Sequence, residues 1–342
     1  MFSYIVLFDA NNQAISFATI QIIAVYLDSV QNEMQSVVEW IKCMGRKLRL
    51  VSSKKPFKIL TCGNTFVSGE HGIFIGKNQD KKLIVKLLAK AVVQFSKDNL
   101  KYQIDAFMLK DFEDESLFIT DALHKVGYYS FNVEPNMVLT LDENWRNFTD
   151  YLAALKTKFR VKAKRALTLS EPLRVEDVDA TSLVKLLPKM TNLYKTVSEN
   201  AGFNLGDFNL ETYQLLKENL QENYIVKAYW LDDVLVGFLS GMITEKSVDA
   251  HFVGIDYSYN RSHAVYQRML YDYILLAIDK KVTTLNFGRT ASEIKSSVGA
   301  VPQNLTIYLR HRSTISNQLL SPFLRQIQPT EFKQKHPFKQ KN

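Results

Sequence analysis

A group of ionisable residues follows a short apolar run in the second half of the chain. In the stretch LNFGRTASEIKSSVGAVP, residues 285–302, Arg289, Glu293 and Lys295 follow a run typical of a β-strand. A short helix is expected there, ending near the glycine and proline of the same stretch. Because ligands usually bind at the carboxyl ends of strands in α/β sheets, we predict a substrate site here. Arg289 is the candidate for binding an anionic group, and Lys295 is the candidate catalytic cation.

Helix capping is an alternative explanation for part of this group. Thr290 and Glu293 have the spacing of a capping box, in which each side chain accepts a hydrogen bond from the backbone N–H of the other residue. This interpretation accounts for Glu293 but not for Arg289 or Lys295. For Lys295 the alternative is an ordinary solvated lysine.

Two candidate bases lie earlier in the chain. His251 belongs to SVDAHFVGID, which alternates like a β-strand. An imidazole has a reference pKa of about 6.5 and is suited to removing a proton from an amine. The alternative is a structural histidine paired with Asp249. Asp256 is the second candidate base, and the start of a turn is its alternative role.

One predicted helix carries positive charge without any acidic residue. Residues 156–165 contain Lys156, Lys158, Arg160, Lys162, Lys164 and Arg165. In a helix Lys156, Arg160 and Lys164 would stack at a spacing of four, which costs a few tenths of a kcal/mol per pair. A phosphate of a nucleotide-linked substrate or of a tRNA backbone would offset this repulsion, so these three residues are predicted to bind substrate. A solvated helix face is the alternative.

Composition limits the functional classes. The chain has 342 residues, is 46% hydrophobic and has a net charge of +8, which allows two domains and favours anionic partners such as phosphates, acidic substrates, RNA or a membrane surface. Two cysteines without a Cys-x-x-Cys pair, and six histidines, argue against a metal site. No signal peptide or membrane-spanning run is recognised, so we expect a cytoplasmic protein. DNA is not among the expected partners.

Hydrophobic periodicity predicts the same order of elements in both halves. The first half is expected to contain a hairpin around an Asn-rich turn, helices over 32–48, 80–99 and 114–127, and strands over 57–64, 71–77, 101–109 and 128–141. The second is expected to contain helices over 144–167, 180–200, 210–220 and 261–281, a three-stranded meander over 224–256 and a last strand over 304–311. The tail from residue 321 is basic and expected to be partly disordered.

This order resembles a known family. The second half is similar to the acetyltransferase (GNAT) fold, and two such units in tandem resemble the FemAB-like transferases and their bacterial acyltransferase relatives. The strongest local resemblance lies in residues 285–302 followed by IYLRH, and HFVGIDYSYNRSHAVYQRMLYDYILLAIDKK resembles the preceding strand and helix. The resemblance implies an α/β fold with a mixed central sheet flanked by helices in each unit. The implied parts are an N-terminally abbreviated, non-catalytic unit over 1–141, an active unit over 142–318 and a basic tail over 319–342.

The resemblance also implies acyl-transfer chemistry. In the family, a lysine at the place of Lys295 is implicated in holding the acceptor or the developing oxyanion, which is worth roughly 3 kcal/mol. Members that use acetyl-CoA hold its diphosphate with a loop of the form Gln/Arg-x-x-Gly-x-Gly/Ala. The equivalent residues Arg261, Ser262 and His263 are thus expected to bind acyl-CoA, although Ala264 and Tyr266 replace the two small positions. Aminoacyl-tRNA is the alternative donor.

The expected function is that of an N-acyltransferase. It would move an acetyl or aminoacyl group to an amine of a small or cell-envelope-precursor substrate that also carries negative charge. Two alternatives stay open: an aminoacyl-tRNA-dependent peptidyl transferase, and a non-catalytic basic module that binds anions or RNA.

Overall fold

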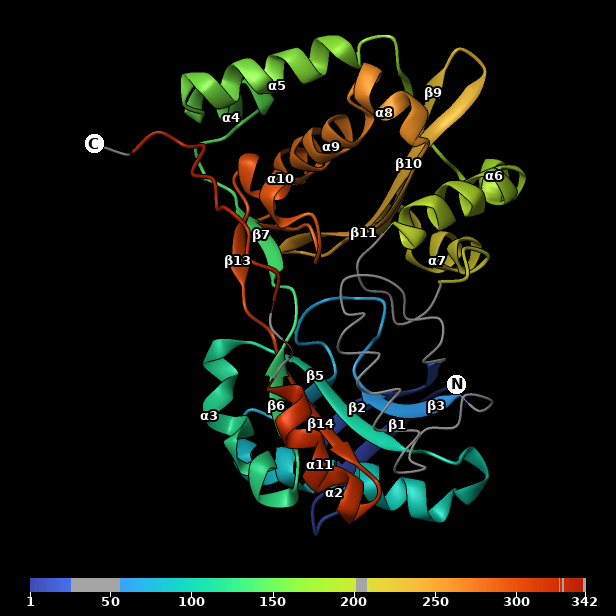
Figure 1. Cartoon of the computed structure of the whole chain (residues 1–342), viewed down its shortest axis with the longest axis vertical. Helices are drawn as coiled ribbons and strands as arrows, with labels where there is room; N and C mark the ends of the chain where they lie inside the picture. The colour runs from blue at the N-terminus through green and yellow to red at the C-terminus, as the bar shows by residue number, and fades with distance from the viewer. Residues whose placement is uncertain (26–55, 201–207, 326, 328, 341–342) are drawn as a thin grey trace. The chain divides into compact units, whose positions relative to one another are not determined.

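The chain forms two compact units in a computed structural model (Figure 1). The structure describes residues 1–25, 56–200, 208–325, 327 and 329–340. The N-terminal unit comprises Met1–Pro135 and Gln303–Thr330, and the C-terminal unit comprises Asn136–Ala201, Asp207–Pro302 and Glu331–Asn342. The helix expected over 32–48 lies outside the described residues.

A seven-stranded sheet forms the centre of the N-terminal unit. Its order is β1-β2-β3-β5-β14-β6, with β4 paired to β2. Strands β3 and β5 are parallel, and the expected hairpin is confirmed as the antiparallel pair β1 and β2. The bounds are β1 Phe2–Phe8, β2 Ala14–Val25, β3 Phe57–Cys62, β4 Ile73–Ile75, β5 Ala106–Phe112, β6 Tyr129–Asn132 and β14 Thr306–His311.

Helix α2 (Lys81–Asp98) connects the parallel strands and packs on one face of this sheet. The Asp80 side chain accepts a hydrogen bond from the N–H of Leu83 and caps the helix. Its buried stripe, which includes Val85 and Leu88, joins the core under Phe107. The helix expected over 114–127 is instead a series of short turns, η2 (Asp114–Ser116), α3 (Leu117–Thr120) and η3 (Asp121–Val126). Two further helical segments are η1 (Leu100–Tyr102) and α11 (Thr314–Leu324).

The C-terminal unit has its own seven-stranded sheet, in the order β13-β7-β12-β11-β10-β9-β8. The predicted meander is confirmed as β9, β10 and β11, which pair antiparallel, whereas β11 and β12 are parallel. The bounds are β7 Asn136–Thr140, β8 Arg174–Asp177, β9 Tyr224–Leu231, β10 Val234–Ile243, β11 Ser247–Ile255, β12 Thr284–Asn286 and β13 Val301–Gln303.

Helices cover both faces of the second sheet (Figure 1). Helix α9 and its neighbours pack on one face. Helices α6 and α7 pack on the other face, where the Phe238 side chain of β10 joins their core. The bounds are α4 Phe148–Ala154, α5 Thr157–Leu169, α6 Ala180–Glu199, α7 Thr212–Leu220, η4 Gln221–Asn223, α8 Tyr257–His263, α9 Val265–Asp279 and α10 Ser292–Ser297.

Each sheet receives one strand from a distant part of the chain. Strand β14, expected as the last strand of the C-terminal unit, lies between β5 and β6 in the N-terminal sheet. Strand β7, expected to close the N-terminal unit, lies beside β12 in the C-terminal sheet. The observed boundaries therefore differ from 1–141 and 142–318 by this reciprocal exchange.

The prediction of a single helix over 144–167 is wrong, because the chain forms two helices in this range. Leu155 is extended, with φ −69° and ψ 141°, and separates α4 from α5. It forms an antiparallel bridge with Phe338, and the N–H of Lys156 donates to the Pro337 carbonyl at 2.8 Å. Pairing with the C-terminal segment requires an extended backbone at this point and interrupts the helix.

The expectation of a disordered tail is wrong for residues 331–339, which pack on the C-terminal unit. Phe338 lies against the rings of Trp145 and Tyr151, with centroids 5.2 and 6.0 Å away. A Cβ on Gly299 would lie only 2.3 Å from the Phe338 ring, so glycine is needed there for the ring to fit. The segment forms part of the core because its aromatic side chain fills this space.

Candidate active site

The parallel strands β11 and β12 separate soon after they pair. They are in register only from Ser247 opposite Thr284 to Asp249 opposite Asn286, and β11 continues to Ile255 paired with β10 but not with β12. A bulge lies in the separated part, because Gly241 pairs with Ala250 while Leu239 pairs with Val253. Such a separation at the carboxyl ends of parallel strands is the usual place for a ligand in an α/β sheet.

The loop after β12 has an unusual backbone. Gly288, Thr290 and Ala291 all have positive φ, at 72°, 64° and 49°. For Thr290 and Ala291 the left-handed conformation costs about 1–2 kcal/mol each. Residues held in such conformations are frequent at functional sites, where surrounding contacts enforce them.

Lys295 supplies those contacts. Its side chain is buried, and its ammonium donates to the carbonyls of Phe287 at 2.8 Å, Gly288 at 3.2 Å and Arg289 at 2.7 Å. Burial lowers its pKa to about 7, whereas the three carbonyls favour the charged form. All three N–H donors of an ammonium are thereby used. In this conformation Lys295 acts on the loop rather than directly on a substrate.

The predicted capping box is not formed. Thr290 is left-handed, whereas a capping residue is normally extended, and Ala291 occupies the position before α10 without a side-chain cap. Glu293 instead pairs with Lys335 at 2.6 Å, a contact that lowers the pKa of its carboxyl. Helix capping therefore does not explain the presence of Glu293 at this position. Arg289 lies half-buried in the loop that Lys295 fastens.

His251 lies in the bulge of β11 among aromatic rings. Its Nδ1 is 3.3 Å from the Tyr224 hydroxyl, and the Phe208 ring is 5.0 Å away. Burial lowers its pKa to about 3. The structure does not form the alternative pair with Asp249, because His251 Nδ1 contacts the Tyr224 hydroxyl and Asp249 accepts from Ser247 Oγ at 2.8 Å.

His251 is expected to make the protein sensitive to acid. Its folded pKa of about 3 lies below the ordinary value of 6.5, so the unfolded chain binds an extra proton between these values. The free energy of unfolding therefore falls as pH drops through 6.5 towards 3, by at most about 1.4 kcal/mol per pH unit. Urea unfolding at several pH values should show a weaker acid dependence for His251→Phe. Equal pH slopes for the variant and the wild type would contradict the assignment.

Asp256 begins α8 and lines a shallow hollow. Its Oδ1 accepts from the N–H and the hydroxyl of Ser258, at 3.0 and 2.6 Å, as expected for a turn or cap. The hollow, of about 420 Å³, is also lined by Lys189, Asn192 and Asp233. Asp256 thus combines its structural role with access to an open groove.

The predicted acyl-CoA loop is a helix end. Arg261, Ser262 and His263 form the last turn of α8, and Ser262 Oγ contacts His263 Nδ1 at 2.9 Å. Ala264 then adopts a left-handed conformation before α9. The N–H of Tyr266, which would face a diphosphate in the family pattern, donates to Asn260 Oδ1 at 2.9 Å. The residues present therefore do not fit the diphosphate of CoA in this way.

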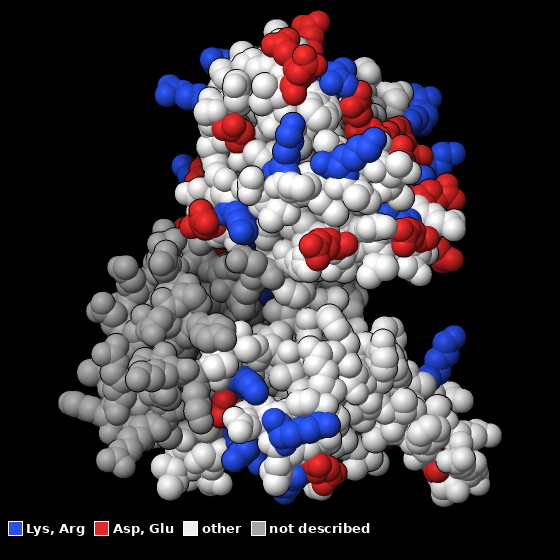
Figure 2. Space-filling model, turned by 90° about the vertical axis from the view of Figure 1, so that its right-hand side faces the viewer, with Lys and Arg blue, Asp and Glu red and all other residues white. Residues whose placement is uncertain are grey.

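Only some of the basic side chains at and within helix α5 form hydrogen bonds with other residues of the unit. Lys156 Nζ donates to the His336 carbonyl at 3.0 Å, and Arg160 donates to the Leu155 carbonyl at 3.1 Å. Lys164 is exposed. Within the described part of the chain, no carboxylate forms an ion pair with a cation of α5. By contrast, acidic and basic side chains mingle on the face of the C-terminal unit drawn in Figure 2.

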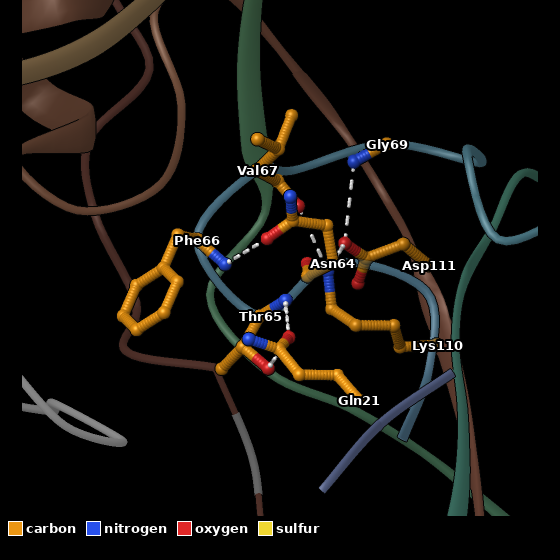
Figure 3. A network of polar contacts seen from close by, with 8 residues as sticks. All are labelled: Gln21, Asn64, Thr65, Phe66, Val67, Gly69, Lys110 and Asp111. Carbon is orange, nitrogen blue, oxygen red and sulfur yellow. Dashed lines mark hydrogen bonds and ion pairs between the residues drawn. The ribbon is translucent and has the colours of Figure 1, made fainter. Parts of the chain in front are cut away.

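The structure adds a buried charged pair that the sequence analysis did not single out. In the N-terminal unit, Lys110 and Asp111 form a close ion pair at the end of β5 (Figure 3). Lys110 also donates to the carbonyls of Asn64 and Val67, both at 2.9 Å, and Asp111 accepts from the N–H of Gly69 at 3.2 Å. The loop after β3 is thereby wrapped around Lys110, beside the parallel pair β3 and β5. In the sequence, this pair could have been recognised from its two adjacent charges inside the otherwise apolar run AFMLKDF.

Comparisons with known proteins identify the fold. No family model matches the chain, and no curated protein matches it significantly. FemX superposes with a TM-score of 0.55 over 95% of this chain and 90% of FemX, at 12% identity. L-PGS from Bacillus licheniformis gives 0.52 over 94% and 89%, at 11% identity. A GCN5-related N-acetyltransferase from Sphaerobacter thermophilus gives 0.47 over 90% and 80%, at 10% identity.

The chain therefore has the FemAB-like fold of two tandem GNAT-like units, as the sequence resemblance predicts. Among the described residues no group of side chains is suited to hold a metal ion, and no helix is both long and apolar enough to cross a bilayer.

Proposed function

We propose that the C-terminal unit transfers an acyl group to an amine. The observation that carries this proposal is the loop of Gly288–Ala291, which is held in a strained conformation by Lys295 where β11 and β12 separate. Likeness to the fold of FemX supports the same class. In this proposal, Arg289, which is half-buried in the loop, binds an anionic part of the substrate.

The proposed reaction joins the amine nitrogen to the carbonyl carbon of an activated acyl group. The nitrogen attacks the carbonyl carbon, and an oxyanion forms. The oxyanion then collapses and the bond to the leaving oxygen breaks. The proton lost by the amine ends on the leaving oxygen. With a pKa of about 3, His251 is too weak a base for this proton. Asp256 is the remaining predicted base, and we propose it for this proton. The hollow that Asp256 lines is formed with α6 and the turn between β9 and β10.

We propose aminoacyl-tRNA rather than acyl-CoA as the donor. The N–H of Tyr266 is already satisfied by Asn260, which removes a donor that a CoA diphosphate would need. The cations of α5, which include exposed Lys158, Lys162 and Lys164, instead suit a phosphate backbone. The acceptor class we propose is an anionic amine, such as a cell-envelope precursor.

Transfer from charged tRNA tests this proposal. Total tRNA carrying labelled amino acids is incubated with the protein and a small-molecule extract of the host, and labelled acceptor is measured. We expect transfer from tRNA and none from acetyl-CoA, and a loss of about 100-fold in Arg289→Gln. The matched control is Arg146→Gln, because Arg146 has a side chain that is 84% exposed in the same unit. Transfer from acetyl-CoA alone would overturn the choice of donor.

A non-catalytic anion-binding module is the second candidate, and the unpaired charge of α5 favours it. Salt dependence separates the two, because binding to phosphates weakens with a slope of about 0.9 per neutralised phosphate on a duplex. Steep salt dependence of tRNA binding without any transfer, unchanged in Arg289→Gln, would favour this module.

A further inference from the structure

A hollow in the C-terminal unit is lined by charges of both signs. Its volume of about 420 Å³ lies within the range of small-molecule sites. Lys189, Asn192 and Thr196 line it from α6, where their spacing of three and four residues places them on one face of the helix. Asp233, in the turn between β9 and β10, and Asp256, at the start of α8, complete the polar lining. The hollow therefore presents one ammonium and two carboxylates to a ligand.

The two carboxylates come from segments that the backbone holds together. The N–H of Asp256 donates to the Val236 carbonyl at 2.9 Å, which fastens the start of α8 to β10 just after Asp233. Asp256 Oδ1 accepts from the N–H and the hydroxyl of Ser258, and Oδ2 forms no hydrogen bond with the described residues. One oxygen of Asp256 thus fixes the carboxylate, and the other is left for a ligand.

Apolar side chains make up the rest of the lining. They are Leu193 of α6 and Val234 and Leu235 of β10, and Leu235 is only 6% exposed. A polar group placed against these side chains would lose its water without gaining a hydrogen bond. The ligand that fits is therefore one with a short hydrocarbon chain between its charged ends.

The opposite charges of the hollow do not neutralise one another. Within the described part of the chain, Lys189 forms no ion pair with Asp233 or with Asp256. A ligand with a single charge would leave one of the two signs without a partner. A ligand with an ammonium and a carboxylate matches both, because charge-assisted hydrogen bonds form at its two ends. The lining thus favours a zwitterion over a simple anion or cation.

We propose that this hollow binds an amino-acid-like zwitterion, with its amine at Asp233 and Asp256 and its carboxylate at Lys189. The role of this ligand rests on the proposed function, in which Asp256 takes the proton of the acceptor. The amine held beside Asp256 is then the acceptor amine. The acceptor is thereby defined as an amine that carries a carboxylate a few bonds away.

Calorimetric titration of the full chain at low salt tests the binding without any acyl donor. The probe is γ-aminobutyrate, and butylamine and butyrate each carry one of its two charges. We expect γ-aminobutyrate to bind with a Kd on the order of 1 mM, and each singly charged compound to bind about tenfold more weakly. Lys189→Gln and Asp233→Asn should each weaken the binding of γ-aminobutyrate about fivefold.

Two matched controls change charges of the same elements outside the hollow. Lys185→Gln replaces an exposed lysine of α6 one turn before Lys189. Asp232→Asn replaces the neighbouring exposed aspartate of the turn, and asparagine tolerates the left-handed backbone of this position. Both variants should bind γ-aminobutyrate like the wild type.

Three results would overturn the proposal: no binding of γ-aminobutyrate, equal binding of butylamine or butyrate, or unchanged binding in both Lys189→Gln and Asp233→Asn. The titration is independent of the transfer assay, so the two failures are distinguishable. Binding without any transfer would support the zwitterion site and count against the proposed function. Transfer without binding would support the function and remove the hollow as the acceptor site.

Discussion

Replacing Lys295 by methionine is expected to destabilise the C-terminal unit by about 3 kcal/mol and to abolish transfer. Methionine fills a similar volume but leaves the carbonyls of Phe287, Gly288 and Arg289 without their buried donor. The left-handed residues Thr290 and Ala291 would then relax, and Arg289 would lose its position. Urea unfolding and the tRNA transfer assay measure the two effects.

The control for this variant is Lys185→Met, which changes an exposed lysine of α6 and should leave both quantities unchanged. A Lys295→Met protein with wild-type stability and activity would show that the three carbonyl contacts do not hold the loop. Lost activity with unchanged stability would instead favour direct contact between Lys295 and the substrate.

The pH dependence of stability provides an independent test of the burial of Lys295. Its folded pKa of about 7 lies below the ordinary lysine value of 10.5, so the unfolded chain binds more protons between these values. The free energy of unfolding of the wild type should therefore rise with pH across this window, relative to Lys295→Met. A difference that is constant with pH would contradict the lowered pKa.

Periodicity within one segment predicted much of the fold. The meander of β9, β10 and β11 and the helix α6 were expected from alternation and from apolar spacing of about 3.6, and both are confirmed. The residues of 285–302 predicted that Arg289 follows the end of a strand and that Lys295 lies near the short helix after it, and the structure has Arg289 after β12 and Lys295 in α10. These features depend on residues close in sequence or on a pattern shared by the family.

The remaining features depend on contacts between distant residues. Thr290 and Glu293 have the spacing of a cap, yet Lys295 fixes the backbone of the loop and Lys335 takes the carboxylate. Likewise β14 and β7 have ordinary strand patterns, and nothing in them shows which sheet they join. Local spacing cannot reveal such partners because many arrangements satisfy it equally well.

Deleting residues 331–342 is expected to change the structure of the C-terminal unit more than the loss of a flexible tail would. The deletion removes the Phe338 ring from Trp145 and Tyr151, and it removes the Lys335 N–H that donates to Ser296 Oγ at 3.1 Å on α10. Truncation of a buried phenylalanine costs about 3–5 kcal/mol, and Phe338 is partly buried, so we expect a loss of about 2–3 kcal/mol.

The same deletion should restore the helix that the sequence predicts. Leu155 is extended because it pairs with Phe338, and Lys156 is bonded to Pro337. Without these partners, α4 and α5 are free to join, since leucine and lysine favour helix. Hydrogen exchange should then show the amides of Leu155 and Lys156 protected as part of one helix, and circular dichroism should show no loss of helix.

A shorter deletion, of residues 340–342, is the matched control, because it keeps the contacts of Phe338 and of Lys339, whose N–H donates to the Ala154 carbonyl at 3.0 Å. It should unfold like the full chain. If the longer deletion also left the unfolding midpoint unchanged, the C-terminal segment would contribute nothing to the stability of the unit. Because Lys335 bonds to Ser296 and Glu293 on the helix that carries Lys295, the longer deletion should also lower transfer. If transfer were lost while stability stayed equal, the role of residues 331–342 would be to position α10 and not to stabilise the unit.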